Sequence, residues 1–354
     1  MDSDDRSGTG PEFEAPALDG LLRIAGGMWA SQTLCGALDL GLFDFLAEGK
    51  GASAAEVAEG LGVAGRPAEI LLTACAALGL LLPDGGRERD GRYVNTPTAE
   101  EYLVRGRPHY FGDYIEMLRS HTSPGWLRVT EAIRSDSPSR WAPDQQERIF
   151  DADNRASTFW DGLRPLSSMT AGVLAAAVDF GTTPRLLDVG GGGGAFVIEL
   201  CRHYPGLAAT VYDLPHVCAY TAGKIADAGL SDRIGTHPGD FFEEPELPTG
   251  HDAILLSMIM HDWDEARNRE LLAKCYRALP SGGRIVISEL LVNDEKTGPL
   301  DAALMSMNML VGTWGRNYTA AEYSEWLRAA GFDQVDTVRF SAPGANGAVL
   351  ARKP

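Results

Sequence analysis

The chain has 354 residues, of which 49 are acidic and 31 are basic, and its formal net charge is −18. Apolar residues make up 44% and charged residues 23%, which is typical of a folded protein with one or two domains. The acidity argues against nucleic acid and anionic membranes as partners, and no apolar run approaches the roughly 18 residues that cross a bilayer.

The first 16 residues are acidic and polar, so we expect a disordered tail rather than a signal or transit peptide. The five cysteines are scattered and none belongs to a CxxC pair. This pattern disfavours a disulfide framework or a structural zinc site, and it favours a reducing cytoplasm.

A winged-helix domain is predicted over residues 17–110. Apolar residues recur at intervals of three and four from Leu18, which indicates amphipathic helices. Ser53 and Glu56 have the spacing of a capping box, and a second helix is expected to open near Pro67. Two short apolar stretches between residues 81 and 97 flank glycine-containing turns, as in a β-hairpin. A helix–turn–helix followed by a hairpin is the winged-helix pattern.

Winged helices either read DNA or serve as packing and dimerisation modules. Residues 67–80, where a recognition helix would lie, contain no lysine or arginine. Residues 50–110 carry seven basic and eight acidic side chains, whereas a DNA reader should show a basic face. We therefore expect dimerisation, and a DNA-binding regulator is the alternative from another functional class.

The rest of the chain divides near residue 180. Residues 111–180 are helical and rich in aromatic side chains, and we expect them to form a linker that lines an acceptor pocket. Residues 181–354 alternate short apolar runs with helical segments, which indicates a parallel sheet covered on both faces. A short glycine-rich turn joins the last two strands, so they can pair antiparallel at one edge.

The stretch LLDVGGGGGAF, residues 186–196, carries the clearest chemical signal. A strand ends at Val189, and Gly190, Gly192 and Gly194 then form a G-x-G-x-G pattern before a helix begins. Glycines allow a sharp turn and close approach of a ligand, and a helix N-terminus favours an anionic group. A run of five glycines therefore predicts a nucleotide-like ligand rather than a plain turn.

Neighbouring acids narrow the choice of ligand. The last glycine of the G-x-G-x-x-G spacing of NAD sites is replaced by Ala195, and Asp188 before the glycines would repel a pyrophosphate. Asp188 instead suits an amine or a sulfonium. Asp213 ends the next strand, where a carboxylate can accept both ribose hydroxyls. Asp240 and Phe241 follow the third strand and suit an adenine ring.

A histidine and a glutamate follow at the same edge of the predicted sheet. His261 lies just past the fourth strand and is a candidate general base, although a lone histidine is often structural. Glu289 ends the fifth strand and could orient the imidazole and stabilise its protonated form. Its alternative role is that of a surface acid at a strand end.

These motifs resemble a known family in both content and order. From Leu186 to the C-terminus, the chain resembles the class I S-adenosylmethionine-dependent methyltransferases, in the motifs LLDVGGGGG, VYDLPHV, GDFF, HDWDE, ALPSGGRIVISE and GRNYTAAEYSEWLRAAGF. The whole chain is similar to the small-molecule O-methyltransferases of plant caffeate and acetylserotonin type and to their bacterial relatives that act on aromatic natural products in antibiotic biosynthesis.

The resemblance implies an α/β fold with a doubly wound seven-stranded sheet and a mostly helical, dimerising N-terminal domain. It implies S-adenosylmethionine as cofactor, a homodimer, and His261 as base beside Glu289. The expected cofactor residues are Asp188, Gly190, Gly192, Gly194, Asp213, Leu214, Asp240, Phe241 and Ser257. The expected acceptor residues are Trp126, Trp160, Met258, Asp262, Met305, Asn308 and Asn317.

One motif departs from the family pattern Gly-Lys/Arg-Glu-Arg-Thr. Here Asn317 replaces the glutamate and Tyr318 the arginine, and an amide cannot hold a charged imidazole as a carboxylate does. Either Glu289 suffices, or the acceptor is not a simple phenol. The alternative function is therefore C-methylation of an aromatic amino acid derivative or an α-keto acid. A keto acid would need an arginine for its carboxylate, for which Arg119 and Arg316 are candidates.

The segment of residues 304–313 bears on metal and acceptor binding. It contains no histidine, whereas some keto-acid relatives bind a metal through one there, so no metal site is expected. Met305, Asn308 and Met309 share one helical face, either as a core stripe or as an adaptable wall of the acceptor pocket. The favoured reaction is methyl transfer to a hydroxyl of a small aromatic acceptor, with His261 taking the hydroxyl proton.

Overall fold

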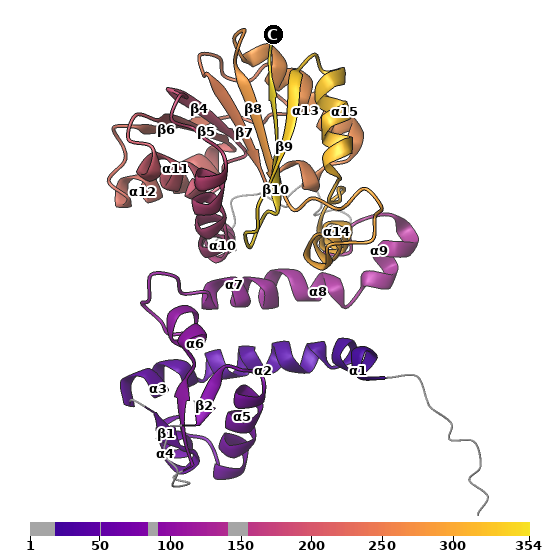
Figure 1. The fold of residues 1–354 in the computed structure, drawn as a ribbon. Coiled ribbons are helices and arrows are strands. Elements are labelled where there is room, and N and C mark those ends of the chain that lie inside the picture. The colour runs from indigo at the N-terminus through magenta and orange to yellow at the C-terminus, as the bar shows by residue number, and fades with distance from the viewer. Residues whose placement is uncertain (1–17, 50, 84–90, 141–154) are drawn as a thin grey trace, which may run out of the picture. The chain divides into compact units, whose positions relative to one another are not determined.

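The computed structural model describes residues 18–49, 51–83, 91–140 and 155–354 (Figure 1). The chain forms two compact units, residues 1–108 and 109–354. The predicted tail of residues 1–16 and the predicted hairpin turn at residues 84–90 lie outside the described residues. No helix in the described ranges is long and apolar enough to cross a membrane.

The first unit combines helices with a small sheet. Its helices are α1 (Asp19–Ala25), α2 (Gly27–Asp39), α3 (Leu42–Gly49), α4 (Ala54–Gly60), α5 (Gly65–Ala77) and α6 (Pro97–Tyr102). Its strands are β1 (Ala52–Ser53), β2 (Leu81–Pro83) and β3 (Arg92–Asn95), in the antiparallel order β1-β3-β2.

The predicted helix–turn–helix and hairpin of the first unit are confirmed. Ser53 and Glu56 form a full capping box at the start of α4, because each side chain bonds the backbone N–H of the other residue. Helix α5 begins two residues before the expected Pro67. Strands β2 and β3 pair antiparallel on either side of residues 84–90.

The second unit is a sheet with the order β6-β5-β4-β7-β8-β10-β9. Its strands are β4 (Arg185–Val189), β5 (Ala208–Asp213), β6 (Ile234–Pro238), β7 (Ala253–Ser257), β8 (Arg284–Glu289), β9 (Asp333–Arg339) and β10 (Gly347–Arg352). Strands β4 to β8 run parallel, and β10 pairs antiparallel with both β8 and β9. The seven-stranded α/β prediction and the antiparallel edge are confirmed.

Helices precede, connect and cover these strands. Before the sheet come α7 (Gly112–Met117), the π-helical turn η1 (Leu118–Thr122), α8 (Ser123–Trp126), α9 (Val129–Ser135) and α10 (Arg155–Ala177). Between strands lie α11 (Ala195–His203), α12 (Pro215–Asp227), the 3₁₀ turn η3 (Met260–Asp262), α13 (Glu265–Ala278), α14 (Leu300–Gly312) and α15 (Ala320–Ala329).

Successive side chains of each strand point to opposite faces of the sheet, and they form two hydrophobic cores, one on each face. In β4, Leu187 packs with the buried residues of α13 and α15, whereas Leu186 packs with those of α10, α11 and α12. Figure 1 shows these two groups of helices on opposite faces of the sheet. Because both faces are covered, the carboxyl edge of the parallel strands is where side chains can meet a ligand.

Candidate active site

Four parallel strands bring predicted site residues to one edge of the sheet. Asp188 is the last residue but one of β4, and Asp213, Ser257 and Glu289 are the last residues of β5, β7 and β8. The register pairs Asp188 with Leu255 across β4 and β7, so these strands end at the same level. The common edge follows from the parallel sheet, as the sequence predicts.

The glycine loop, residues 190–194, follows β4 and takes conformations that favour glycine. Gly190, Gly192 and Gly194 have φ values of 71°, 53° and 73°. A methyl group on Gly192 would lie 2.5 Å from a ring carbon of Trp160 in α10, so only glycine fits beneath this ring. Asp213 fixes the loop, because its Oδ2 accepts the N–H of Gly192 at 2.8 Å and its Oδ1 accepts the N–H of Leu214 at 2.7 Å.

Two buried polar groups beside the glycine loop lack a hydrogen-bond partner among the described residues. They are Asp188 Oδ2 and Ser257 Oγ, and Asp188 is only 1% exposed. Burial, with a smaller contribution from the charge of Asp213, raises the pKa of Asp188 to about 8. A cationic group placed here would pair with Asp188 and remove the cost of burying its charge.

The loop after β6 is held by two side chains. Asp240 Oδ1 accepts the N–H of Phe242 at 2.8 Å, which closes a turn. The buried Lys274 Nζ of α13 donates to the carbonyls of Phe241 and Glu244, both at 2.9 Å. The aromatic side of Phe241 and the carboxylate of Asp240 are thus presented from a backbone that α13 fixes.

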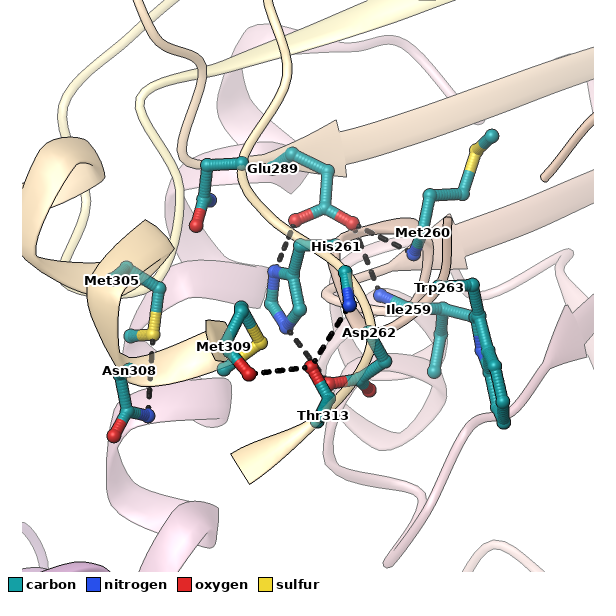
Figure 2. A network of polar contacts seen from close by, with 12 residues as sticks. Ile259, Met260, His261, Asp262, Trp263, Glu289, Met305, Asn308, Met309 and Thr313 are labelled. Atoms are coloured by element: carbon teal, nitrogen blue, oxygen red, sulfur yellow. Dashed lines mark hydrogen bonds and ion pairs between the residues drawn. The ribbon is translucent and has the colours of Figure 1, made fainter. Parts of the chain in front are cut away.

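His261 and Glu289 form a buried pair (Figure 2). Glu289 Oε2 lies 2.7 Å from His261 Nδ1, and the two residues are 0% and 5% exposed, respectively. Glu289 Oε1 accepts the N–H groups of Ile259 and Met260, both at 3.0 Å. One carboxylate therefore orients the imidazole and also fixes the backbone that carries it. His261 Nε2, on the other side of the ring, lies 3.8 Å from Asp262 Oδ1.

The pair changes the acidity of the histidine. Burial alone lowers the pKa of His261, but the charge and hydrogen bond of Glu289, together with the charge of Asp262, outweigh it and raise the pKa to about 9. The site therefore stabilises an imidazolium. Asp262 has a pKa raised to about 6, chiefly by burial and partly by Glu289, although His261 and Arg140 act in the opposite direction.

The motif that departs from the family pattern, residues 315–319, is hydrogen-bonded to the backbone that follows His261 and to the backbone that follows β8. Tyr318 Oη donates to the carbonyl of Trp263 at 2.7 Å, and Asn268 Nδ2 of α13 donates to the same carbonyl at 3.0 Å. Asn317 is 2% exposed, and its Nδ2 donates to the carbonyl of Leu290 at 2.7 Å. Asn317 thus ties the motif to the end of β8, and Tyr318 ties it to the segment after His261.

A hydrogen bond between side chains links α14 to α8. Trp126 Nε1 donates to Asn308 Oδ1 at 3.0 Å, and Asn308 Nδ2 lies 3.8 Å from the sulfur of Met305. Figure 2 shows Met305, Asn308 and Met309 on the α14 side of His261. Met258, just past β7, has a φ of 56°, which is uncommon for a residue other than glycine.

Matches to two family models decide the family. A model described as an O-methyltransferase domain matches residues 141–333, more than half of the chain, and an O-methyltransferase dimerisation domain matches residues 22–105. The chain belongs to the O-methyltransferase family.

Relatives of this methyltransferase extend over its whole length. It is 57% identical to a 3-hydroxy-5-methyl-1-naphthoate 3-O-methyltransferase of Streptomyces sahachiroi over 98% of both chains. It is 33% identical to an L-tyrosine C(3)-methyltransferase of Streptomyces lavendulae, over 98% of this chain and 96% of the relative. The structure of human N-acetylserotonin methyltransferase with its S-adenosylmethionine (SAM) matches with a TM-score of 0.85 and 29% identity, over 97% and 99% of the two chains.

The methyltransferase uses S-adenosylmethionine, and the predicted family, fold class and cofactor are confirmed. The residues at the sheet edge fit this cofactor. The glycine loop leaves no room for a Cβ at Gly192, and the oxygens of Asp188 and Ser257 that lack partners among the described residues suit a cationic amino group.

The two arginines predicted to bind a carboxylate of the acceptor, Arg119 and Arg316, both pair with glutamates. Arg119 pairs with Glu116, and Arg316 pairs with Glu322 at 2.9 Å; both arginine side chains are more than a third exposed. Arg140 is partly buried, and its charge acts to lower the pKa of Asp262. No spacing identifies Arg140 in the sequence, because its neighbours in space come from α8 and α14.

Proposed function

We propose that this methyltransferase acts on a hydroxyl group of an aromatic natural-product acceptor, and that His261 is the general base. The observation that carries the proposal is the buried contact of 2.7 Å between His261 Nδ1 and Glu289 at the edge that holds the glycine loop. The 57% identity to a hydroxynaphthoate O-methyltransferase supports an aromatic acceptor and a role in secondary metabolism.

The paired carboxylate sets the direction of proton transfer. Because the Nδ1–H of His261 donates to Glu289, Nε2 is the ring nitrogen that accepts the hydroxyl proton. The resulting imidazolium is stabilised by Glu289 and by Asp262 at 3.8 Å. S-adenosylmethionine supplies the methyl group on a positive sulfur, to which the electron pair of the broken carbon–sulfur bond returns. The protein contributes further by holding the two reactants in line.

The cofactor would be held by the residues of the sheet edge. Asp188 and Ser257 would receive its amino group, Asp213 its ribose hydroxyls, and Asp240 with Phe241 its adenine ring. Leu214 would pack beside the ribose. The glycine loop would allow the ligand to approach the backbone closely.

The acceptor would lie between His261 and the aromatic side chains of residues 111–180, which we infer to be a linker between a winged-helix domain (17–110) and a catalytic domain (181–354). Trp126 and Asn308 form one wall through their hydrogen bond. The remaining residues proposed for this pocket are Trp160, Met258, Asp262, Met305 and Asn317.

Carbon methylation is the second candidate. The 33% identity to an L-tyrosine C(3)-methyltransferase and the amide at position 317 favour it. However, Glu289 meets the need for an acid beside His261 by itself, so the missing glutamate of the motif is not required for a base.

We also infer a homodimer formed through the first unit. Helices α1 and α2 expose large apolar side chains, including Leu21 at 63%, Ile24 at 79% and Trp29 at 73%. Several large apolar side chains exposed on neighbouring helices are typical of an interaction site, and the dimerisation domain model covers these helices in part. Sedimentation of the protein and of Trp29→Glu would test this.

The proposed reaction is tested with ¹³C-methyl-labelled S-adenosylmethionine and a panel of hydroxynaphthoates and other phenols. We expect an NMR signal from a methyl carbon bonded to oxygen, absent when the hydroxyl is replaced by hydrogen. A product methylated on a ring carbon would overturn O-methylation and support the second candidate. His261→Ala provides the control for uncatalysed transfer.

A further inference from the structure

The first part of α10 carries two adjacent side chains with different contacts. Trp160 lies against the glycine loop, because a methyl group on Gly192 would lie 2.5 Å from its ring and one on Gly193 would lie 3.8 Å from its Cβ. The next residue, Asp161, is part-buried and has no role in the mechanism proposed above. Its contacts explain how the Trp160 ring is kept in place.

Asp161 binds two residues of α12. Its Oδ1 accepts the hydroxyl of Tyr220 at 2.6 Å and the ammonium group of Lys224 at 2.7 Å. Tyr220 and Lys224 are four positions apart, so they share one face of α12, and Lys224 Nζ lies 5.0 Å from the centroid of the Tyr220 ring. We call Asp161, Tyr220 and Lys224 the α10–α12 clasp.

The clasp is formed by an ionised carboxylate. Burial alone would raise the pKa of Asp161, but the hydrogen bonds from Lys224 and Tyr220 outweigh burial and lower the pKa. Hydrogen bonds to a charged group are stronger than those between neutral groups. Only 22% of the Lys224 side chain is exposed, so solvent screens this pair less than a pair on the open surface.

The same helix α12 also holds the glycine loop. Thr221, next to Tyr220, is fully buried, and its Oγ1 donates to the carbonyl of Gly192 at 2.5 Å. A methyl group on Gly193 would lie 3.2 Å from a ring carbon of Tyr220. Neighbouring side chains of α12 therefore contact both the glycine loop and the residue that follows Trp160.

This arrangement fixes the space beside Gly192. Because the clasp ties α10 to α12, the backbone that carries Trp160 keeps its distance from the loop that Thr221 holds. A wall that is already formed before a ligand arrives reduces the conformational entropy lost on binding. The clasp is thus expected to act on affinity for a ligand at the glycine loop.

We propose that Asp161 is a positioning residue, which binds Tyr220 and Lys224 and thereby holds the Trp160 ring as a preformed wall of the cofactor site. Trp160 then borders the cofactor as well as the acceptor pocket. Asp161 itself acts only through Trp160 and touches neither reactant. This inference rests on the proposed function for the place of the cofactor at the sheet edge.

The first test removes the carboxylate from the full-length protein and measures binding of S-adenosylhomocysteine by calorimetry. Asp161→Ala should raise the Kd about tenfold, because both contacts of the clasp are lost. Asp161→Asn keeps an acceptor oxygen and should lie between the wild type and Asp161→Ala. The KM for S-adenosylmethionine should rise with the Kd, while kcat at saturating cofactor should fall by less than about threefold. A lowered or unchanged Kd in Asp161→Ala would overturn the proposal.

A double-mutant cycle separates positioning from a general structural role. Trp160→Ala should itself raise the Kd, and adding Asp161→Ala to it should change the Kd by less than about twofold, because the ring that Asp161 positions is then absent. Kd increases that multiply in the double variant, or an unchanged Kd in Trp160→Ala, would show that Asp161 does not act through Trp160 and would overturn the proposal.

Controls distinguish the clasp from the place of the cofactor. Glu199→Gln, which changes an ion pair with Arg202 on α11, should bind like the wild type, and the Tm of Asp161→Asn should stay near that of the wild type. A Kd raised in Asp213→Asn but unchanged in Asp161→Ala would overturn the clasp alone. A Kd unchanged in both variants would also overturn the proposed place of the cofactor.

Discussion

Replacement of Glu289 by glutamine tests how the buried pair works. In the wild type, one oxygen accepts two backbone N–H groups and the other accepts the Nδ1–H of His261. An amide has one oxygen only. If this oxygen keeps the backbone bonds, the amide NH₂ faces Nδ1 and favours the imidazole tautomer with its proton on Nε2. That tautomer cannot accept a proton at Nε2.

The magnitude follows from the pKa of His261. Its rise from 6.5 to about 9 corresponds to about 3 kcal/mol of stabilisation of the imidazolium. Without the carboxylate, burial is opposed only by the charge of Asp262, so the pKa of His261 falls, and we expect kcat to fall by about 10²- to 10⁴-fold. The rising limb of the pH profile of kcat/KM, expected near pH 9 in the wild type, should move to lower pH in Glu289→Gln.

Protein stability should respond with a defined sign. Because folding raises the pKa of His261, the stabilisation by the pair is fully present below pH 6.5 and is lost as the pH rises through about 9. Glu289→Gln should remove this dependence in urea unfolding between pH 6 and 9, while Glu325→Gln, exposed on α15, should keep it. Turnover within threefold of wild type, with an unshifted pH limb, would refute the reasoning.

Three further expectations concern the cofactor. Binding of S-adenosylmethionine should release protons at pH 7, because the pKa of Asp188 is raised to about 8 and a cationic partner ionises it; calorimetry in buffers of different ionisation enthalpy measures this, and Asp188→Asn should abolish the release. Lys274→Met should raise the Kd for the cofactor about tenfold, because the carbonyls of Phe241 and Glu244 lose their donor, while kcat at saturating cofactor stays nearly unchanged. An unchanged Kd in a binding titration would contradict this. Gly192→Ala should abolish cofactor binding measured by calorimetry, since its Cβ would lie 2.5 Å from Trp160, whereas Gly206→Ala, with no atom within 4 Å, should bind normally.

Much of the site could be predicted because its residues follow parallel strands. Strand ends are readable from short apolar runs, and parallel strands place those ends at one edge of the sheet. This is why Asp188, Asp213 and Glu289 are predicted to lie at one edge, as the structure has them, whereas Ser257 is implied only by the family resemblance. His261 follows from the same rule, since η3 comes directly after β7.

Other features depend on tertiary packing and left no local signal. The turn before β10 permits antiparallel pairing, but it does not show that β10 inserts between β8 and β9. The hydrogen bond of Tyr318 to the carbonyl of Trp263 joins residues that are 55 positions apart in the chain, which no spacing predicts. No local pattern predicts the place of Arg140 either, because its backbone is held by the carbonyl of Val311, 171 residues further along the chain.

The central claim is that His261 removes the hydroxyl proton, and single-turnover methyl transfer by His261→Ala tests it most directly. With a phenolic acceptor of high pKa, we expect the rate to fall by about 10²- to 10⁴-fold while cofactor Kd stays near wild type. With a nitro-substituted acceptor that is already ionised, the loss should shrink toward tenfold or less. Equal losses for both acceptors, or full activity with the first one, would contradict a role of His261 as the base.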